Sequence, residues 1–432
     1  MNYYFILGRE NKISQREFLC VLADFGFDFC EAKLRDNNHF SYSILNEEVI
    51  EIKSETLGEE TAKKLIDILG GTVKIFKKIS SKEEKLAGLL EKEDKEGKII
   101  FGLSNYSKEK VDCFKLALEA KKSLKRAVRI VAGKENDRLS SAQSFQYQMS
   151  YKNLEYGLFD SGIGKLIAVQ NIDDWTRHDF GKPKSDAVSG MLPPKLARMM
   201  VNLAIGQSGI RNYESEIMNK NHNSGLSIHD SILPLVVDPF CGSGNILIEA
   251  LFLGCDVIGS DISEKAVEDT RTNLSWLTQS VIPTEVEGSS NRFLDSARND
   301  KENIKISKQD ATKYDFSQID RDFVVVSEPY LGKPRKAKLR IEEEKEAEKE
   351  LSKLYLDFLH NLKLTGLRLK TIVLVFPLFE LVNGKKLSIF ERCIDFISDI
   401  GYTLVYPPLD YGRDYQVVKR EIIVLKILNS KF

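Results

Sequence analysis

The sequence predicts an α/β protein, with a Rossmann-like domain in the C-terminal half and an α+β, ferredoxin-like region before it. Two observations predict this class. Residues 235–261 have the pattern of a strand, a small-residue turn, a helix and a second strand, the unit from which parallel sheets are built. Residues 1–80 have the pattern β-α-β-β-α-β, which is typical of a ferredoxin-like sandwich.

The ferredoxin-like region is predicted over residues 1–80. Ser14 and Glu17 have the spacing of a capping box, so a helix is expected from residue 14 to about residue 25. A second helix over residues 57–69 is closed by Gly70 and Gly71. Strands are expected at residues 3–7, 31–34, 39–45 and 72–79.

A second N-terminal region is predicted over residues 81–172. A charged stretch at 83–96 precedes expected strands at 98–103, 128–131 and 165–170. A helix over 108–125 is expected to bury an apolar face of Val111, Phe114, Leu118 and Leu124. This helix and the next strand hold a cluster of cations that could contact phosphates, although a solvated surface explains them equally well: Lys121, Lys122, Lys125, Arg126 and Arg129.

A linker with a leading helix is predicted over residues 173–205. It ends in the stretch GMLPPKLARMMVNLA, where Pro193 and Pro194 fit the first turn of a helix over residues 195–205. Residues 208–232 are polar and are interpreted as a loop.

The C-terminal domain is predicted over residues 206–432, with a seven-stranded sheet. Asp322 to Ser327 is an apolar, buried strand, and a helix over 341–362 is expected to cover the sheet. Residues 278–303 lack apolar periodicity and are interpreted as a surface insertion. The other expected elements are a helix at 264–276, strands at 303–307, 371–376, 401–406 and 421–427, and a closing hairpin strand at 417–421.

The glycine turn at residues 241–244 predicts a nucleoside ligand. Glycines let the backbone approach a ligand closely, and the following helix N-terminus offers free N–H groups. Asp261, which ends the second strand, can accept from both ribose hydroxyls. The turn is neither GxGxxG nor GxxxxGK[ST], which disfavours a dinucleotide and a phosphate loop. A tight turn in an ordinary α/β domain is the alternative.

Three stretches resemble known RNA-modifying enzymes. Asp-Pro-Phe-Cys-Gly-Ser-Gly, residues 238–244, resembles the S-adenosylmethionine loop of class I methyltransferases that act on exocyclic amines of nucleic acid bases. GMLPPKLARMMVNLA resembles the segment before the catalytic sheet of THUMP-containing tRNA guanosine N2-methyltransferases. Residues 81–172, with Arg126-Ala127-Val128-Arg129 and Leu139-Ser140-Ser141, resemble the RNA-binding THUMP domain. The resemblance implies methylation of guanosine N2 in tRNA, with position 10 as the expected target.

The same resemblance implies a binding site for S-adenosylmethionine around the glycine turn. Asp238 and residues 242–244 would hold the methionine part of the cofactor, and Asp310 would accept from the adenine amine. The full predicted cofactor set is Leu192, Pro193, Asp238, Pro239, Phe240, Cys241, Gly242, Gly244, Asp261, Ile262, Asp310 and Ala311.

The predicted catalytic motif is Ser327-Glu328-Pro329-Tyr330, at the end of a buried strand. In the enzymes that it resembles, the motif is Asp/Asn-Pro-Pro-Tyr/Phe: the acid and a proline-held carbonyl accept from the target amine, and the aromatic ring stacks on the base. Alignment from the strand places Glu328 at the acid, whereas alignment from Pro329-Tyr330 places Ser327 there. We favour Glu328, because a carboxylate at this edge is otherwise costly to place. A strand that leaves the sheet through a proline turn is the alternative.

The net charge of −1, from 63 basic and 64 acidic residues, is not that of a typical nucleic-acid binder, so the distribution of charge matters more. Residues 333–340 hold five cations directly after the catalytic motif, of which Lys333, Arg335 and Lys336 are predicted to contact RNA phosphates. A solvated loop explains them equally well.

Composition bounds the compartment and the partners. Six scattered cysteines without a CxxC pair indicate free thiols in a reducing cytoplasm, and five histidines without ligand spacing predict no metal site. No apolar run approaches the ~20 residues that span a bilayer, and the first residues do not resemble a signal peptide, so no membrane contact is expected. Beside tRNA as partner, the resemblance allows for a small zinc-binding activator subunit.

Three other functions stay open at this point. An rRNA guanine N2-methyltransferase shares the architecture, and a DNA adenine N6-methyltransferase shares the catalytic logic, although the THUMP-like region disfavours the latter. The altered Ser-Glu-Pro-Tyr motif also allows a non-catalytic protein that binds cofactor and RNA.

Overall fold

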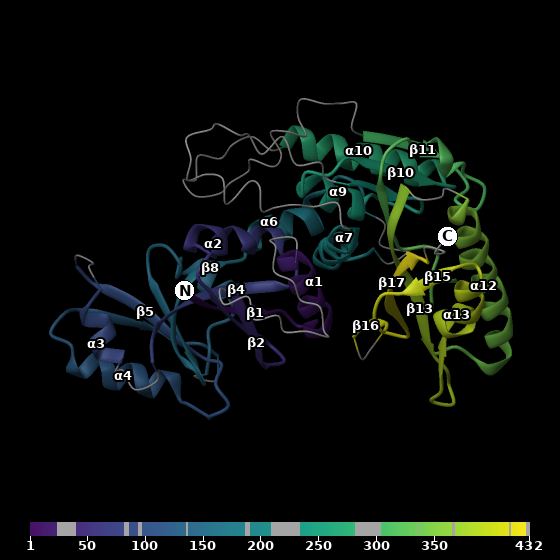
Figure 1. Ribbon diagram of the computed structural model, residues 1–432. Helices are drawn as coiled ribbons and strands as arrows, with labels where there is room; N and C mark the ends of the chain where they lie inside the picture. Colours follow the sequence, from purple (N-terminus) through teal and green to yellow (C-terminus); the bar gives the residue numbers. More distant parts are fainter. Residues whose placement is uncertain are drawn as a thin grey trace. The chain divides into compact units, whose positions relative to one another are not determined.

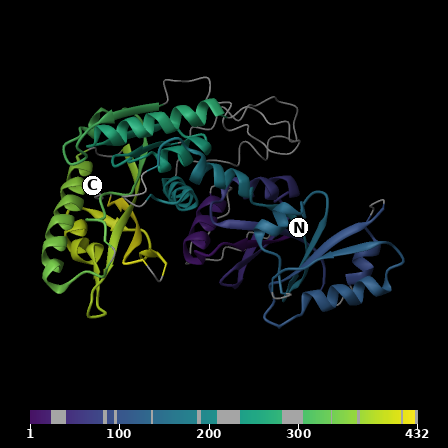
Figure 2. The same ribbon diagram turned by 180° about the vertical axis from the view of Figure 1, so that it is seen from behind.

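The computed structural model describes residues 1–23, 40–81, 86–93, 97–134, 137–185, 191–208, 234–280, 304–335, 337–364, 368–413 and 416–428. They belong to two compact units, residues 1–18 with 27–175 and residues 19–26 with 176–432, and each is described by itself (Figures 1 and 2). The strand predicted at 31–34, most of the predicted loop at 208–232, most of the predicted insertion at 278–303 and Lys336 lie outside the described residues.

The first unit is built on one sheet of eight strands, in the order β2-β3-β1-β4-β8-β7-β5-β6. Its strands are β1 Asn2–Leu7, β2 Phe40–Asn46, β3 Val49–Ser54, β4 Thr72–Ser80, β5 Ile99–Asn105, β6 Val128–Val131, β7 Leu154–Phe159 and β8 Gly162–Val169. Its helices are α1 Asn11–Ala23, of which residues 11–18 belong to this unit, α2 Glu59–Ile68, α3 Leu86–Glu91, α4 Cys113–Ser123 and α5 Ser141–Gln146.

Strands β1 to β4, with α1 and α2, follow the predicted chain order β-α-β-β-α-β. The hairpin of β2 and β3 supplies its second and third strands, and Asn46 Oδ1 closes the turn by accepting from the Glu48 N–H at 2.9 Å. The sequence does not identify β3, because the buried Glu51 interrupts its apolar run.

The capping box expected at Ser14 and Glu17 is wrong. Helix α1 begins at Asn11, so Ser14 lies in its first turn and donates its hydroxyl to the Glu10 carbonyl at 2.8 Å. Glu17 is buried and accepts from the N–H groups of Gly70 and Gly71 at 2.7 and 2.8 Å. Its carboxylate therefore fixes the glycine turn between α2 and β4 rather than the start of its own helix.

The apolar face expected on the helix after β5 is also wrong in part. Asp112 caps α4 by accepting from the Lys115 N–H, and the buried face consists of Cys113, Ala117 and Ala120. Phe114 and Leu118 are therefore one position away from the core, and their exposed fractions are 36% and 37%. The small residues, not the large ones, let α4 approach the sheet.

The predicted boundary at residue 80 lies within the eight-stranded sheet, because β4 pairs antiparallel with β8. A buried ion pair joins β4 to β7, with Lys74 Nζ 2.6 Å from Glu155 Oε1. Ser104 and Ser144 also donate to Glu155, at 2.6 and 2.5 Å. Ser144 ends the stretch LSSAQS, residues 139–144, which begins with the predicted Leu139-Ser140-Ser141, so this stretch has a structural role in the unit.

The second unit contains a nine-stranded sheet. Seven strands form the path β11-β10-β9-β12-β13-β17-β15; β14 pairs with β13, and β16 pairs with β17. The strands are β9 Leu235–Asp238, β10 Val257–Asp261, β11 Ile304–Lys308, β12 Phe323–Ser327, β13 Leu369–Glu380, β14 Lys386–Ser388, β15 Tyr402–Leu404, β16 Leu409–Tyr411 and β17 Val418–Ile427. The first five strands of the path are parallel to their neighbours, and β17 is antiparallel to β13.

Helices cover both faces of this sheet, as the predicted α/β class requires (Figure 1). Helix α6 Ile172–Thr176 lies at the boundary between the units, with residues 172–175 in the first. The helices of the second unit are a π-helical turn Arg177–Gly181, α7 Pro194–Ser208, α9 Asn245–Phe252, α10 Glu264–Ser280, a 3-10 turn Phe316–Gln318, α12 Ile341–Lys363 and α13 Ile389–Asp399. Apolar side chains of α12 and α13 pack on β9, β12, β13 and β17 in one core cluster. The α/β class predicted for this domain is confirmed.

Two details of this sheet differ from the prediction. Residues 417–421 do not form a separate hairpin strand, because β17 runs without interruption from Val418 to Ile427. The short strands β14 and β16 raise the number of strands from the predicted seven to nine.

Candidate active site

The order of the strands places a topological switch point at the carboxyl ends of β9 and β12. The chain winds outward from β9 through β10 to β11 on one side and from β12 to β13 on the other. At such a switch point the loops after the two central strands diverge, which opens a crevice where α/β proteins bind ligands. Asp238 ends β9 and Ser327 ends β12, so the predicted cofactor and catalytic motifs meet there.

One hydrogen bond joins the two motifs. Ser327 Oγ donates to Asp238 Oδ1 at 2.5 Å, and both side chains are buried. Asp238 Oδ1 also accepts from the Phe240 N–H at 3.2 Å, which starts the glycine turn. Burial raises the pKa of Asp238 to about 7, against the lowering effect of the Ser327 hydroxyl and the Phe240 amide.

The glycine turn has the backbone shape that requires glycine. Gly242 and Gly244 have φ angles of +52° and +87°. A Cβ atom on Gly244 would approach Thr270 of α10 to 3.1 Å, whereas one on Gly242 would meet no atom within 4 Å. Thr270 Oγ1 donates to the Gly242 carbonyl at 2.8 Å, which leaves the open side of the turn for a ligand. Cys241 is buried, and its N–H donates to the Ser260 carbonyl at 2.9 Å.

Asp261 fits the role of ribose acceptor. Its Oδ2 accepts from the Gly242 N–H at 3.1 Å and its Oδ1 from the Ser263 N–H at 2.9 Å. A carboxylate has about four lone-pair sites, so both oxygens keep acceptor capacity after these bonds. Ile262, the next residue, has an exposed fraction of 69% and offers an apolar surface beside this carboxylate.

Asp310 follows β11 and is oriented by its own turn. Oδ1 accepts from the Thr312 hydroxyl at 2.7 Å and its N–H at 3.0 Å, and Lys313 lies 3.2 Å from Oδ2. The Thr312 hydroxyl, followed by its amide and by Lys313, lowers the pKa of this carboxyl below its usual value. Ala311 is buried beneath the turn.

Glu328, the favoured catalytic acid, is held by an arginine. Arg420 Nε in β17 donates to Glu328 Oε1 at 2.5 Å, and the two side chains are 9% and 14% exposed. Burial raises the pKa of Glu328, and Arg420 opposes this rise. Pro329 is buried, whereas Tyr330 has an exposed fraction of 41%, as a ring that stacks on an incoming base requires.

The segment before α7 is attached to the start of α9 by buried polar contacts. Lys182 Nζ donates to Asn245 Oδ1, and Asn245 Nδ2 donates to the Leu192 carbonyl at 2.6 Å. Asn273 of α10 donates to the carbonyls of Lys184 and Ser243, at 2.9 and 2.8 Å. The buried Leu192 and half-buried Pro193 are thereby fixed to the helix that follows the glycine turn.

A second buried network supports the same segment. Glu249 of α9 contacts His178 Nδ1 at 2.8 Å through Oε1 and Arg198 Nε at 2.7 Å through Oε2. Although its burial acts in the opposite direction, the charges of Arg198 and His178 lower the pKa of Glu249. The Arg198 guanidinium also lies 4.4 Å from the centroid of the Phe252 ring.

The four described cations of residues 333–340 are paired with acids of the same unit. Lys333 lies 3.6 Å from Glu346 and Arg335 lies 3.1 Å from Glu343, both in α12. Lys338 contacts Glu380 at 3.1 Å, and Arg340 contacts Glu343 at 3.4 Å. These ion pairs lower the net positive field that the sequence suggests for this loop.

The cation cluster of the first unit is mostly exposed. Lys121, Lys122, Lys125 and Arg129 lie on the surface of α4, the turn after it and the edge strand β6. Arg126 is half-buried and donates to the carbonyls of Glu93 and Gly97, at 3.1 and 3.4 Å. Arg126 therefore stabilises the chain before β5, and the other four cations lie at the surface.

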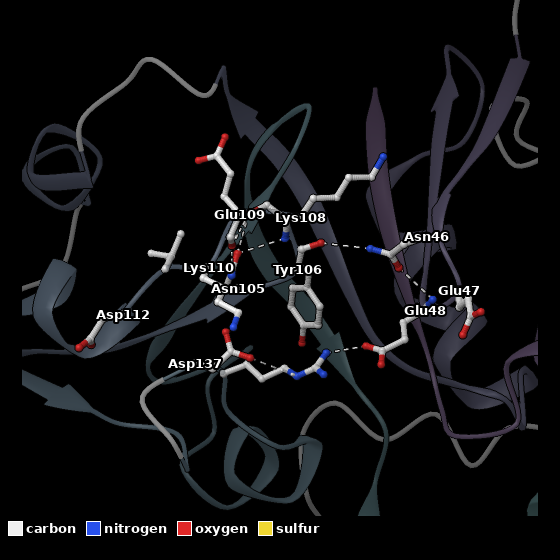
Figure 3. Close-up of a pocket in the computed structure, with 13 residues that line it drawn as sticks. Asn46, Glu47, Glu48, Asn105, Tyr106, Lys108, Glu109, Lys110, Asp112 and Asp137 are labelled. Atoms are coloured by element: carbon white, nitrogen blue, oxygen red, sulfur yellow. Dashed lines mark hydrogen bonds and ion pairs between the residues drawn. The ribbon is translucent and has the colours of Figure 1, made fainter.

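The first unit also contains a cavity of about 850 Å³, lined in part by residues 105–112 and the β2–β3 turn (Figure 3). Asn46 Nδ2 donates to the Tyr106 carbonyl at 3.2 Å, and Arg138 pairs with Glu48 at 2.5 Å. Its lining mixes carboxylates with cations, so it offers no field of a single sign.

Several residues that build the site are not identified by motifs. Glu249 and Arg198 interrupt apolar helical patterns, a signal that a buried ion pair leaves in a sequence. Arg420, Thr270 and Asn273 carry no such signal, because each acts through contacts between elements far apart in the chain.

The part of the chain that the structure describes contains neither a metal-binding group nor a membrane-spanning helix. No group of three or more His, Cys, Asp or Glu side chains there could hold a metal ion. No helix there is both long and apolar enough to cross a membrane.

Comparison with known proteins points to methyltransferases. A family model described as RMKL-like, methyltransferase domain, matches residues 233–367, which include the glycine turn and the Ser-Glu-Pro-Tyr motif. The chain is 44% identical over 85 residues to a tRNA (guanine(10)-N2)-dimethyltransferase of Methanothermobacter thermautotrophicus, covering 20% of this chain and 18% of that protein. It is 36% identical over 85 residues to the protein of the same name from Methanocaldococcus jannaschii, covering 20% of this chain and 17% of that protein.

The matched segment thus spans less than a fifth of either curated relative. Among solved structures, a predicted N6-adenine-specific DNA methylase from Listeria monocytogenes aligns over 98% of this chain and 95% of its own, with 12% identity and a TM-score of 0.42. This likeness says nothing about the substrate.

Proposed function

We propose that the protein transfers a methyl group from S-adenosylmethionine to the exocyclic N2 amine of a guanosine in tRNA, at position 10. The observation that carries the proposal is the hydrogen bond between Ser327 and Asp238, because it joins the catalytic motif to the cofactor turn at the switch point. The matched methyltransferase model and the names of the two curated relatives support it.

The cofactor supplies an electrophilic methyl group on a sulfonium, and the residues of the second unit would bind and orient it. The open side of Gly242 and the carboxylate of Asp238 would accommodate the methionine part. Asp261 would accept from the ribose hydroxyls, and Asp310 from the adenine amine, with Ile262 beside the ring. Leu192 and Pro193 would close this site from the segment attached to α9.

Glu328 and the Pro329 carbonyl would accept the two hydrogens of the target amine. These bonds orient the nitrogen lone pair toward the methyl carbon, so that the N–C bond forms as the S–C bond breaks. The amine then loses one proton, which Glu328 can take directly or through water. Tyr330 would stack on a guanine flipped out of the tRNA.

The first unit would bind the tRNA. Lys121, Lys122, Lys125 and Arg129 are exposed, so phosphates can reach them at the surface of the sheet and of α4. We also propose that residues 81–172 are a THUMP-type RNA-binding region and that Lys333 and Arg335 make weaker phosphate contacts. We further propose a cytoplasmic location, which the free, buried cysteines of the described residues support. A small zinc-binding activator subunit belongs to the proposal as a partner.

Methyl transfer from labelled S-adenosylmethionine to unmodified tRNA tests the proposal. The full chain should transfer label, and Glu328→Ala should lower the rate by about 100-fold or more, since positioned acid–base groups contribute about 10²- to 10⁴-fold. Cofactor binding should persist in the variant. Cofactor binding by the natural protein without transfer to tRNA would instead favour the non-catalytic alternative, for which the altered Ser-Glu-Pro-Tyr motif is the supporting observation.

A further inference from the structure

Glu328 and Arg420 meet across a strand that lies between their own. Glu328 follows β12 and Arg420 belongs to β17, and both strands pair with β13. Arg420 Nε donates to Glu328 Oε1 at 2.5 Å, and both side chains are largely buried. The guanidinium therefore spans β13 to reach the carboxyl end of β12, where the predicted cofactor and catalytic motifs meet.

We propose that Arg420 is a positioning residue for the reaction, whose ion pair holds the Glu328 carboxylate as an oriented acceptor for the target amine. The inference rests on the proposed function and adds to it a residue that no motif contains. Arg420 acts through Glu328 and needs no contact with the substrate.

The length of the acid explains why a second residue is needed. The resembled motif has Asp or Asn where this chain has Glu328, and the extra methylene adds a rotatable bond. A longer side chain loses more rotamer freedom when it is ordered, so an unrestrained glutamate would hold the amine poorly. One hydrogen bond to Arg420 fixes the carboxylate, and with about four lone-pair sites it still has room for the amine hydrogens.

The same contact favours the ionised, accepting form of the carboxyl. Burial raises the pKa of Glu328 and Arg420 opposes that rise. A protonated carboxyl keeps its carbonyl oxygen as an acceptor, but its O–H opposes a donor amine and it cannot take the proton that the amine loses. Without Arg420, Glu328 would stay protonated to higher pH, so the acid limb of the pH–rate profile would move to higher pH.

Two other titratable groups face Glu328, and their titration must be distinguished from that of Glu328. Asp238 at the end of β9 has its pKa raised mainly by burial and in smaller part by the Glu328 charge. Tyr355 of α12 has its pKa raised by burial first and then by Glu328, and its hydroxyl donates to the Val375 carbonyl at 2.9 Å. Of these two groups, Asp238 is the one whose pKa lies near neutrality. Its protonation is monitored by cofactor binding, whereas the protonation of Glu328 is monitored by the transfer rate.

Single-turnover transfer to unmodified tRNA, with cofactor saturating at every pH from 6 to 9, tests this role in the full chain. Arg420→Gln should lower the rate at pH 7 by about 10-fold or more and recover part of it as the pH rises. Arg420→Lys, which keeps a charge, should rescue most of the rate. The cofactor Kd, measured at each pH, should change less than about 2-fold in both variants, because neither removes a cofactor contact.

Arg321→Gln is the matched control, since Arg321 pairs with Asp256 at the amino ends of β12 and β10, at the opposite edge of the same sheet. It should leave the pH–rate profile unchanged. Two results would contradict the proposal: an acid limb that does not shift in Arg420→Gln, or an equal loss of rate at every pH that Arg420→Lys does not restore. Either would mean that the ion pair only stabilises the packing of β17 and β12. A natural protein that transfers no label at any pH would overturn the proposed function, and this inference with it.

Discussion

At the scale of single residues, one short hydrogen bond joins two halves of the candidate site. Ser327 donates to Asp238 in a buried position, and Asp238 also anchors the glycine turn through Phe240. The two alternatives for the acid of the motif therefore have different partners in the structure, since Ser327 contacts Asp238 and Glu328 contacts Arg420.

Ser327→Ala should weaken cofactor binding by about 10-fold at pH 7, because a hydrogen bond to a charged group is worth about 1.5–3 kcal/mol. The loss should be greater at pH 6, since the pKa of Asp238 rises further once the hydroxyl is gone. Titration calorimetry at pH 6, 7 and 8 measures it. Ser317→Ala, which removes a hydroxyl from the exposed Asp315, is the control and should leave binding unchanged. Equal affinities for the two variants would contradict the role of Ser327.

Asp238→Asn should stabilise the protein without ligand at pH 8 and weaken cofactor binding. The pKa of Asp238 rises from 3.8 to about 7 on folding, so ionisation costs stability progressively as pH rises through this window. The full cost above pH 7 is about 4 kcal/mol, and relief of about 1–3 kcal/mol is expected at pH 8 but little at pH 4. Urea unfolding at both pH values measures the difference, and an equal effect at both would exclude Asp238 as the titrating group.

At the scale of elements, α9 is the support of the site. Its first residue, Asn245, holds the Leu192 carbonyl, and Glu249 one turn later holds His178 and Arg198. Periodicity predicts the helix and its burial, because most of its residues are apolar. It cannot predict which charged residue in another segment will neutralise Glu249, since that depends on packing between elements.

Glu249→Gln should lower the free energy of unfolding by about 3 kcal/mol or more, because it removes the charge of the buried carboxylate that pairs with Arg198. Glu268→Gln in the neighbouring helix α10 is the matched control. Glu268 is 68% exposed and lies 3.9 Å from Arg271, so its removal should cost less than about 0.5 kcal/mol. Denaturant unfolding of both variants tests the comparison, which would fail if the two changes cost the same.

At the scale of the whole molecule, the chain forms two compact units. The α/β class, the glycine turn and its neighbouring acids follow from the sequence, because local patterns and spacing determine them. The pairing of β4 with β8 and the contact between Arg420 and Glu328 do not, since both join residues far apart in the chain. The exposure of Phe114 and Leu118 shows the same limit, because helix periodicity identifies an apolar stripe but not the face that meets the sheet.

The exposed cations of the first unit should control affinity for tRNA. Replacing Lys121, Lys122, Lys125 and Arg129 together by Gln should weaken tRNA binding and flatten its salt dependence, by up to about 0.9 in slope for each phosphate that is no longer neutralised. The cofactor Kd should not change. Lys333→Gln/Lys338→Gln, at cations paired with Glu346 and Glu380, is the comparison and should have a smaller effect. A greater loss of tRNA affinity in the Lys333→Gln/Lys338→Gln variant would instead indicate that the second unit makes the main contacts with RNA.

The identity of the methylated nucleoside tests the central claim most directly. Unmodified tRNA is incubated with the full chain and labelled S-adenosylmethionine, then digested, and the labelled nucleoside is identified by mass spectrometry. A tRNA with adenosine at position 10 and deproteinised rRNA serve as parallel substrates. The account predicts label in N2-methylated guanosine from the natural tRNA, and none from the position-10 variant or the rRNA. Label in another nucleoside, or only in rRNA, would contradict it.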